Sequence, residues 1–201
     1  MNQNPTIRKA KEEDLNQLFT LSKKAYLGNL DKTISEKYGF LVSDFSKEDY
    51  TKFIKYADYF YTAGLAEHGI AGFVLAYRSS KINRKNEWTN MFLRYFFREP
   101  FVMVKQLCVD RPFSSLGIGK ALYTHLCQQT QGVPLVTAIV VEPKNKRSER
   151  FHNKFGFEQI MIVQPSDDET RPRSIWWYSN GAKRPYFRVK MIKAFENNQH
   201  L

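Results

Sequence analysis

A short turn in the middle of the chain has the residue types that bind a phosphate group. The turn Ser114–Lys120 follows the apolar run Phe101–Val109 and precedes a stretch whose apolar residues recur at helical spacing. The first amides of a helix have no partner within the helix, and the helix dipole adds partial positive charge there. Glycine lets a phosphate approach the backbone, and Lys120 adds a full charge. The order strand, glycine turn and helix therefore predicts a site for a phosphorylated ligand.

Two familiar phosphate-binding motifs fit this turn poorly. A P-loop begins with glycine and has a hydroxyl residue after its lysine, whereas Ser114 and Ala121 stand at those places here. A dinucleotide fold needs a third glycine where this chain has Leu122. A helix start whose two glycines only allow close packing would also explain the turn, so the choice depends on the downstream sequence.

A second motif lies beyond the next predicted strand. The β-branched run Leu135–Glu142 predicts that strand. The motif that follows is made of Asn145, Ser148, Phe151, His152, Gly156 and Phe157. Together with the turn, it resembles the acyl-CoA-dependent GNAT N-acetyltransferase superfamily, most strongly between residues 101 and 163. Ser114 stands where the family has Arg or Gln, so Arg111 or Lys120 would have to supply that pyrophosphate contact.

The resemblance implies which residues hold acetyl-CoA as co-substrate, without a metal. Backbone at Leu107–Val109 would hold the acetyl and pantetheine groups, and the turn would hold the pyrophosphate. Asn145 would bond pantetheine or the nearby helix start, although a turn or cap residue after Pro143 explains it equally well. The implied cofactor-binding residues are Leu107, Cys108, Val109, Ser114, Ser115, Leu116, Gly117, Ile118, Gly119, Lys120, Asn145, Ser148 and Phe151.

His152 and Glu142 are the candidates for proton transfer. His152 stands where many family members have a tyrosine thought to protonate the leaving thiolate, and an ordinary histidine pKa near 6.5 suits that role. Packing beside Phe151 is its alternative role. Some members of the family place a glutamate on the strand that corresponds to Phe101–Val109, which contains none here. Glu142, at the end of the next predicted strand, is therefore a candidate general base, and Glu67 and Asp58 are weaker candidates. A water chain to solvent is the alternative base.

The composition narrows the class of protein. A chain of 201 residues with 42% hydrophobic content predicts a single globular domain over residues 1–201. The net charge of +11 suits coenzyme A as well as nucleic acid, and no nucleic-acid motif accompanies it. Cys108 and Cys127 indicate buried thiols of a reducing compartment. No membrane helix, signal-peptide layout or metal-ligand spacing is present in the sequence, so a cytoplasmic protein is expected.

The predicted fold class is α+β, with a mixed and largely antiparallel central sheet flanked by helices; the resemblance adds the GNAT fold, with splayed fourth and fifth strands. The elements expected upstream are a strand Thr6–Lys9, a helix Lys11–Tyr26, a helix capped by Ser46 and Asp49, and a hairpin Tyr59–Ala66 with Ile70–Tyr77. A strand Tyr186–Ala194 is expected to close the sheet.

Two insertions are expected, at about residues 78–100 and 164–185. The first places Trp88, Met91, Phe92, Tyr95 and Phe96 on one helical face, which predicts a packed helix, a wall for the acceptor or a homodimer contact. The second contains Trp176, Trp177 and Tyr178, interpreted as core packing or as the lining of an acceptor pocket.

The function expected is acetyl transfer from acetyl-CoA to a primary amine of a small molecule, peptide or protein, by direct attack in a ternary complex. The alternative is a non-catalytic acetyl-CoA-binding sensor or interaction module. A basic nucleic-acid binder that reuses the fold is a third interpretation.

Overall fold

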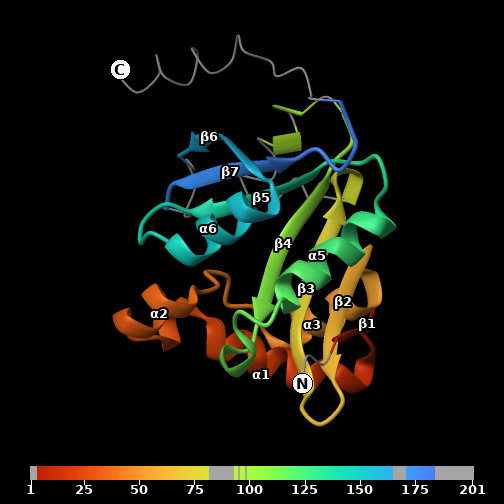
Figure 1. Cartoon of the computed structure of the whole chain (residues 1–201), viewed down its shortest axis with the longest axis vertical. Coiled ribbons are helices and arrows are strands. Elements are labelled where there is room, and N and C mark those ends of the chain that lie inside the picture. The colour runs from red at the N-terminus through yellow and green to blue at the C-terminus, as the bar shows by residue number, and fades with distance from the viewer. Residues whose placement is uncertain (1–3, 82–92, 95, 98, 165–170, 184–201) are drawn as a thin grey trace.

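A mixed sheet of seven strands organises the computed structural model, which describes residues 4–81, 93–94, 96–97, 99–164 and 171–183 (Figure 1). The strands are β1 (Thr6–Lys9), β2 (Tyr59–Leu65), β3 (Gly69–Arg78), β4 (Val102–Val109), β5 (Leu135–Val140), β6 (Glu158–Val163) and β7 (Arg173–Tyr178). Their order is β1-β2-β3-β4-β5-β7-β6, and only β4 and β5 are parallel. The α+β class and the largely antiparallel sheet are therefore confirmed.

The parallel pair β4–β5 is joined over a short length. Val102–Val104 pair with Leu135–Thr137, and there the pairing stops. β4 continues to Val109 with β3 as its partner, while β5 continues with β7. The two strands thus diverge after Val104, and Figure 1 shows the β5–β7–β6 part of the sheet turned away from the β1–β4 part. The expected splay of the fourth and fifth strands is confirmed.

Helices cover both faces of the sheet. They are α1 (Leu15–Ala25), α2 (Lys32–Tyr38), α3 (Lys47–Tyr56), α5 (Ile118–Gln129) and α6 (Lys146–Phe155). On one face, α1 and α3 bury an apolar cluster that includes Leu18, Leu21, Tyr50, Phe60, Phe73 and Cys108. On the other face, α5 and α6 pack a cluster that includes Ile118, Leu122, Tyr123, Phe151, Phe155 and Phe157. Burial of these apolar side chains holds each helix against its face of the sheet.

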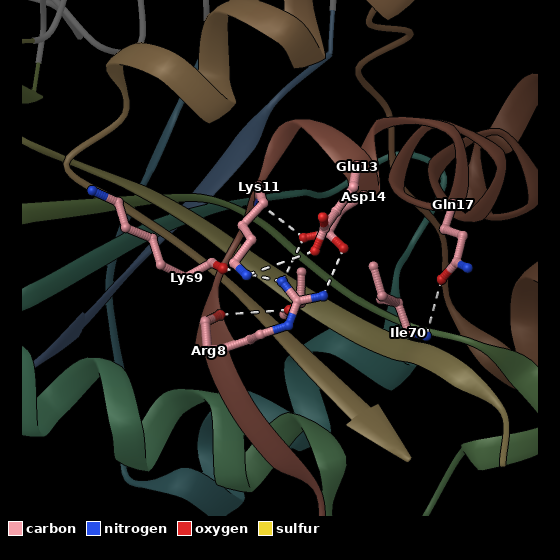
Figure 2. A network of polar contacts seen from close by, with 8 residues as sticks. Arg8, Lys9, Lys11, Glu13, Asp14, Gln17 and Ile70 are labelled. Carbon is pink, nitrogen blue, oxygen red and sulfur yellow. Dashed lines mark hydrogen bonds and ion pairs between the residues drawn. The ribbon is translucent and has the colours of Figure 1, made fainter. Parts of the chain in front are cut away.

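The start of α1 is anchored by a buried carboxylate (Figure 2). Nη1 and Nη2 of Arg8 donate to Asp14 at 2.6 and 2.7 Å, and the amide of Lys11 donates at 2.8 Å. Burial opposes the ionisation of Asp14, but these hydrogen bonds hold its pKa below the ordinary value. Gln17 accepts from the amide of Ile70 at 3.2 Å. The helix is thereby fixed to β1 and to the start of β3.

Most of the expected upstream elements are confirmed. α1 follows a 3-10 turn at Glu12–Asp14 and so begins at Leu15, a few residues later than the sequence pattern predicts. The capping box is formed, because Asp49 N donates to Ser46 Oγ at 3.1 Å and Ser46 N donates to Asp49 at 3.0 Å. The hairpin β2–β3 is also formed. Cys108 is buried, whereas Cys127 is only half-buried.

The carboxyl-terminal part of the sheet differs from the expectation. β7 lies inside the stretch interpreted as an insertion at 164–185, and it pairs with both β5 and β6. Trp176 and Trp177 are buried, so this strand has no alternation of polar and apolar residues to reveal it. The expected closing strand Tyr186–Ala194 lies outside the described residues. So do most residues of the 78–100 insertion, although Phe96 is described and buried.

Candidate functional site

A cavity of about 890 Å³ lies where β4 and β5 part. One wall is β4 at Val104–Val109, and the opposite wall is β5 at Thr137–Val140 together with α6. The turn that leads into α5 closes one end, and the loop Tyr38–Val42 after α2 lies along another side. The walls thus come from segments far apart in the sequence, which the diverging strands bring together.

The turn before α5 has the geometry of an anion site. Gly117 is the N-cap of α5, with φ of 81°, in the left-handed region that favours glycine. A Cβ on Gly117 would meet no atom within 4 Å, so the space beside it is open. The first helical bond runs from Ala121 N to Gly117 O at 2.9 Å. The amides of Ile118, Gly119 and Lys120 therefore have no acceptor within the helix.

The second glycine of the turn has a different structural role. A Cβ on Gly119 would lie 3.2 Å from the ring of Phe151 on α6. Gly119 therefore allows α5 and α6 to approach each other, whereas Gly117 leaves the backbone open. The packing interpretation thus holds for Gly119, whereas phosphate binding at Gly117 stays a prediction that its open space allows.

The charged side chains around the cavity are all cations. They are Lys105, Arg111, Lys120, Arg147, Arg150 and Lys154, and among the described residues no carboxylate lines the cavity. Coenzyme A carries a pyrophosphate and a 3′-phosphate. A cationic lining beside free backbone amides fits these groups. The residues present therefore fit acetyl-CoA, and they would hold it through the turn and the facing side of α6.

Asn145 joins two walls of the cavity. It is the N-cap of α6, and its Oδ1 accepts from the amide of Ser148 at 3.1 Å. Its Nδ2 donates to the carbonyl of Phe40 at 3.0 Å, in the loop after α2. The side chain is buried, with 5% exposed. Both ends of the amide thus have partners within the protein, and Asn145 holds the loop against the start of α6.

His152 is buried and hydrogen-bonded at both ring nitrogens. Nδ1 lies 2.8 Å from the carbonyl oxygen of Ser148, and Nε2 lies 2.8 Å from the hydroxyl of Tyr123. A carbonyl only accepts, so we assign the ring proton to Nδ1, and Nε2 then accepts from Tyr123. Burial lowers the pKa of His152 to about 4, although the bond to Ser148 opposes this. The imidazole is therefore neutral near pH 7, and its one proton is already bonded.

The predicted site residues fall into two groups. Those that line the cavity are Leu107, Cys108, Val109, Ser114, Ser115, Gly117, Ile118, Gly119, Lys120, Asn145, Ser148, Phe151 and His152. Leu116 and Glu142 do not line it, and both side chains are exposed. The binding and catalytic roles of these residues stay predictions.

Three residues that contribute to the site are not marked by either sequence motif. Tyr123 bonds His152 from α5, Phe40 accepts from Asn145, and Arg147 donates from α6 to Ser115 Oγ at 3.0 Å. Each depends on a contact between elements that are distant along the chain. The only local hint was the basic stretch around Arg147, which a solvated helix face would explain equally well.

Two classes of site are not found in the part of the chain that the structure describes. No group of three or more His, Cys, Asp or Glu side chains could hold a metal ion there. No described helix is long and apolar enough to cross a membrane.

One family model matches most of the chain, and several solved structures share its fold. The model of the acetyltransferase (GNAT) family matches residues 26–157. NAA60 of Arabidopsis thaliana, solved with acetyl-CoA, has a TM-score of 0.62 and 13% identity, over 87% of this chain and 99% of that one. The ribosomal-protein-S18-alanine N-acetyltransferase of Escherichia coli has a TM-score of 0.59 and 14% identity, over 90% and 96% of the two chains.

Ard1 of Thermoplasma volcanium has a TM-score of 0.60 and 15% identity, over 87% of this chain and 97% of that one. At such identities the solved structures establish the fold alone. No curated protein sequence matches this chain.

Proposed function

The chain belongs to the acetyltransferase (GNAT) family, and we propose that it transfers an acetyl group from acetyl-CoA to a primary amine of a small molecule, peptide or protein. The observation that carries this proposal is the cavity where β4 and β5 part, continuous with the cationic turn before α5. The bound acetyl-CoA supplies an activated acetyl thioester. The chain's residues bind and orient the two substrates in a ternary complex.

The edge of β4 is suited to hold an amide-rich chain. Beyond Val104 this strand has β3 as its partner on one side and, among the described strands, none on the side toward β5. Backbone amides and carbonyls at Leu107–Val109 that face the gap need hydrogen-bond partners when water is displaced. Pantetheine contains amide groups, and it can pair with this edge as an added strand would. Such pairing would fix the position of the thioester in the gap.

Direct attack by the amine is favoured over transfer through an enzyme thiol. Cys108 is the cysteine that lines the cavity. Burial raises its pKa to about 12, so its thiolate is scarce near pH 7. Cys127 does not line the cavity. The proposed route therefore needs no acetylated cysteine.

Proton transfer in this site depends on water more than on an ionised side chain. No described carboxylate lines the cavity, and the exposed Glu142 lies outside it. We propose that the ammonium proton of the acceptor leaves through water to solvent. The neutral His152, bonded to Tyr123 and Ser148, is then a positioning residue that holds α5 and α6 together.

A thiol-release assay tests the proposal. Metal-free protein is incubated with acetyl-CoA and single amines, among them small amines, a lysine peptide and a peptide with a free amino terminus. The last belongs in the panel because one structure of similar fold, Naa50 of Arabidopsis thaliana, was solved with the bisubstrate analogue CoA-Ac-MVNAL. Amine-dependent release of thiol is expected. Binding of acetyl-CoA without release by any amine would favour the sensor, and no binding at millimolar acetyl-CoA would contradict both.

A further inference from the structure

Arg147 reaches from α6 to the turn before α5. Its Nη2 donates to Ser115 Oγ at 3.0 Å, so the guanidinium lies at the turn although the residue belongs to another element. Gly39 makes room for the stem of the side chain, since a Cβ there would lie 3.3 Å from Arg147 Cβ. The side chain is half-buried and lines the cavity. The hydrogen bond to Ser115 thus holds the guanidinium at the turn.

The turn itself lacks a guanidinium or amide side chain at the place where the family pattern has one. Ser114 stands there. Arg111 is close in sequence, but its Nη2 donates to the carbonyl of Lys24 at 2.7 Å, at the end of α1. Arg150 also lines the cavity, but its Nε donates to Lys146 within the same helix. Lys120 is exposed and offers a point charge without a planar fork.

We propose that Arg147 binds the pyrophosphate of acetyl-CoA and replaces the contact that Ser114 cannot make. A guanidinium has five N–H donors in a fixed fork, which matches two phosphate oxygens, and the bond to Ser115 uses one of them. The free amides at the start of α5 bind the same group from the other side. This inference rests on the proposed function, because it assigns a residue to the cofactor of that reaction.

Calorimetric titration with CoA and with 3′-dephospho-CoA tests the assignment. Arg147→Gln removes the charge and the fork while keeping a polar side chain of similar reach. Because a charge-assisted pair is lost, the Kd of both ligands is expected to rise about tenfold or more. The matched control is Lys146→Gln, which also removes one positive charge. Lys146 is the preceding residue, and its side chain is exposed and does not line the cavity. The Kd of this control is expected to change less than about twofold.

A second control separates binding from shaping of the turn. Ser115 has φ of 71°, which glycine adopts without strain, so Ser115→Gly removes the hydroxyl and leaves the backbone in place. Arg147 remains, so the Kd for CoA is expected to rise clearly less than in Arg147→Gln, because only the hydroxyl that orients the guanidinium is lost. Salt gives a third measurement. The Kd of wild type should rise more steeply with NaCl than that of Arg147→Gln, because screening weakens a contact that the variant lacks.

Each contrary result has its own meaning. Unchanged affinity of Arg147→Gln in a protein that binds CoA would overturn the inference and leave the proposed function intact. Weakening by Ser115→Gly to the same extent as by Arg147→Gln would show that the pair shapes the turn without contacting phosphate. A loss with CoA but not with 3′-dephospho-CoA would move the contact to the 3′-phosphate and overturn the assignment. Failure of wild type to bind CoA would overturn the proposed function itself.

Discussion

Two regions of the cavity differ in the charge of the groups that line them. At the turn before α5, Lys120 is exposed, Arg147 reaches in from α6, and backbone amides have no helical partner. Where α5 and α6 meet, Tyr123 and His152 are buried, and burial raises the pKa of the hydroxyl and lowers that of the imidazole. One end keeps its charges available to a ligand, and the other removes them. The contrast supports the proposal that charged groups bind the cofactor and that neutral groups position the reacting atoms.

The largest effect is expected from a substitution in the turn before α5, where the charged groups gather. Gly117→Val places a β-branched side chain at φ of 81° and fills the open space beside the turn. The strain and the blocked approach of phosphate should raise the Kd for acetyl-CoA about hundredfold, measured by calorimetry.

Gly132→Val is the matched control for that variant. Gly132 has φ of 74° and open space around its Cβ position, but it lies after α5 and does not line the cavity. The backbone strain is similar, and the Kd should stay near the wild-type value. Equal loss in both variants would mean that strain, and not the position of the turn, weakens binding.

The next prediction concerns the neutral end and the pH dependence of stability. His152 has a pKa of about 4 in the folded chain, below its value in the unfolded chain. Its contribution to stability is therefore complete above about pH 6.5 and is lost as pH falls toward about 4. Between pH 7 and pH 5 wild type should lose about 2 kcal/mol of unfolding free energy through this residue.

Urea unfolding at several pH values gives the unfolding free energy of wild type and of His152→Phe. The contribution of His152 is the difference between the two proteins in how steeply this free energy changes with pH. The variant should keep a small slope of the same sign, because burial also lowers the pKa of His125. Identical slopes in the two proteins would mean that His152 titrates normally in the folded chain.

The same variant sharpens the contrast in catalysis. Because Nε2 of His152 accepts from Tyr123 and carries no proton, His152→Phe should lower kcat by less than about tenfold. A fall of about 10²-fold, together with loss of one limb of the pH–rate profile, would instead assign the thiolate's proton to His152.

The smallest effect is expected far from the cavity, at Asp14. Asp14→Asn removes a buried carboxylate that accepts from Arg8 and Lys11, and should cost about 1 kcal/mol, since the Arg8 side chain is 40% exposed. Its folded pKa is lowered, so wild type loses this stability only as pH falls below about 3.9.

Kinetic constants and the Kd for acetyl-CoA should not change in Asp14→Asn. Glu13→Gln is the control, because Glu13 is exposed and pairs with Lys11 only at 3.7 Å. A change in Kd with Asp14→Asn would show that the anchor of α1 is coupled to the cavity.

Local patterns explain what the sequence could predict. The capping box at Ser46 and Asp49 and the turn at Gly117 depend on neighbours within a few residues, and both formed as expected. β7 was not predicted, because Trp176 and Trp177 are buried on opposite faces and the strand therefore lacks the alternation of polar and apolar residues. The contact of Arg147 was not predicted for a different reason. Its partner Ser115 is 32 residues away, and no local sequence pattern relates residues at that separation.

His152 shows how far a motif can be carried. Its place in the chain predicted proximity to the cavity, and the structure has it among the lining residues. The protonation state, however, depends on burial and on hydrogen-bond partners. Tyr123 bonds the ring from α5, and Ser148 bonds it from one turn earlier in α6. A motif therefore indicates where a side chain lies before it indicates its ionisation state.

The gap between β4 and β5 has a consequence for the lifetime of the protein itself. A ligand that binds the folded chain and not the unfolded one stabilises it by RT ln(1 + [L]/Kd), which is about 2.7 kcal/mol when the ligand is at a hundredfold its Kd. Because pantetheine would complete the sheet where those strands diverge after Val104, the cofactor would act as a removable structural element. The abundance of folded protein would then follow the supply of acetyl-CoA, and a starved cell would hold less of it even at constant synthesis.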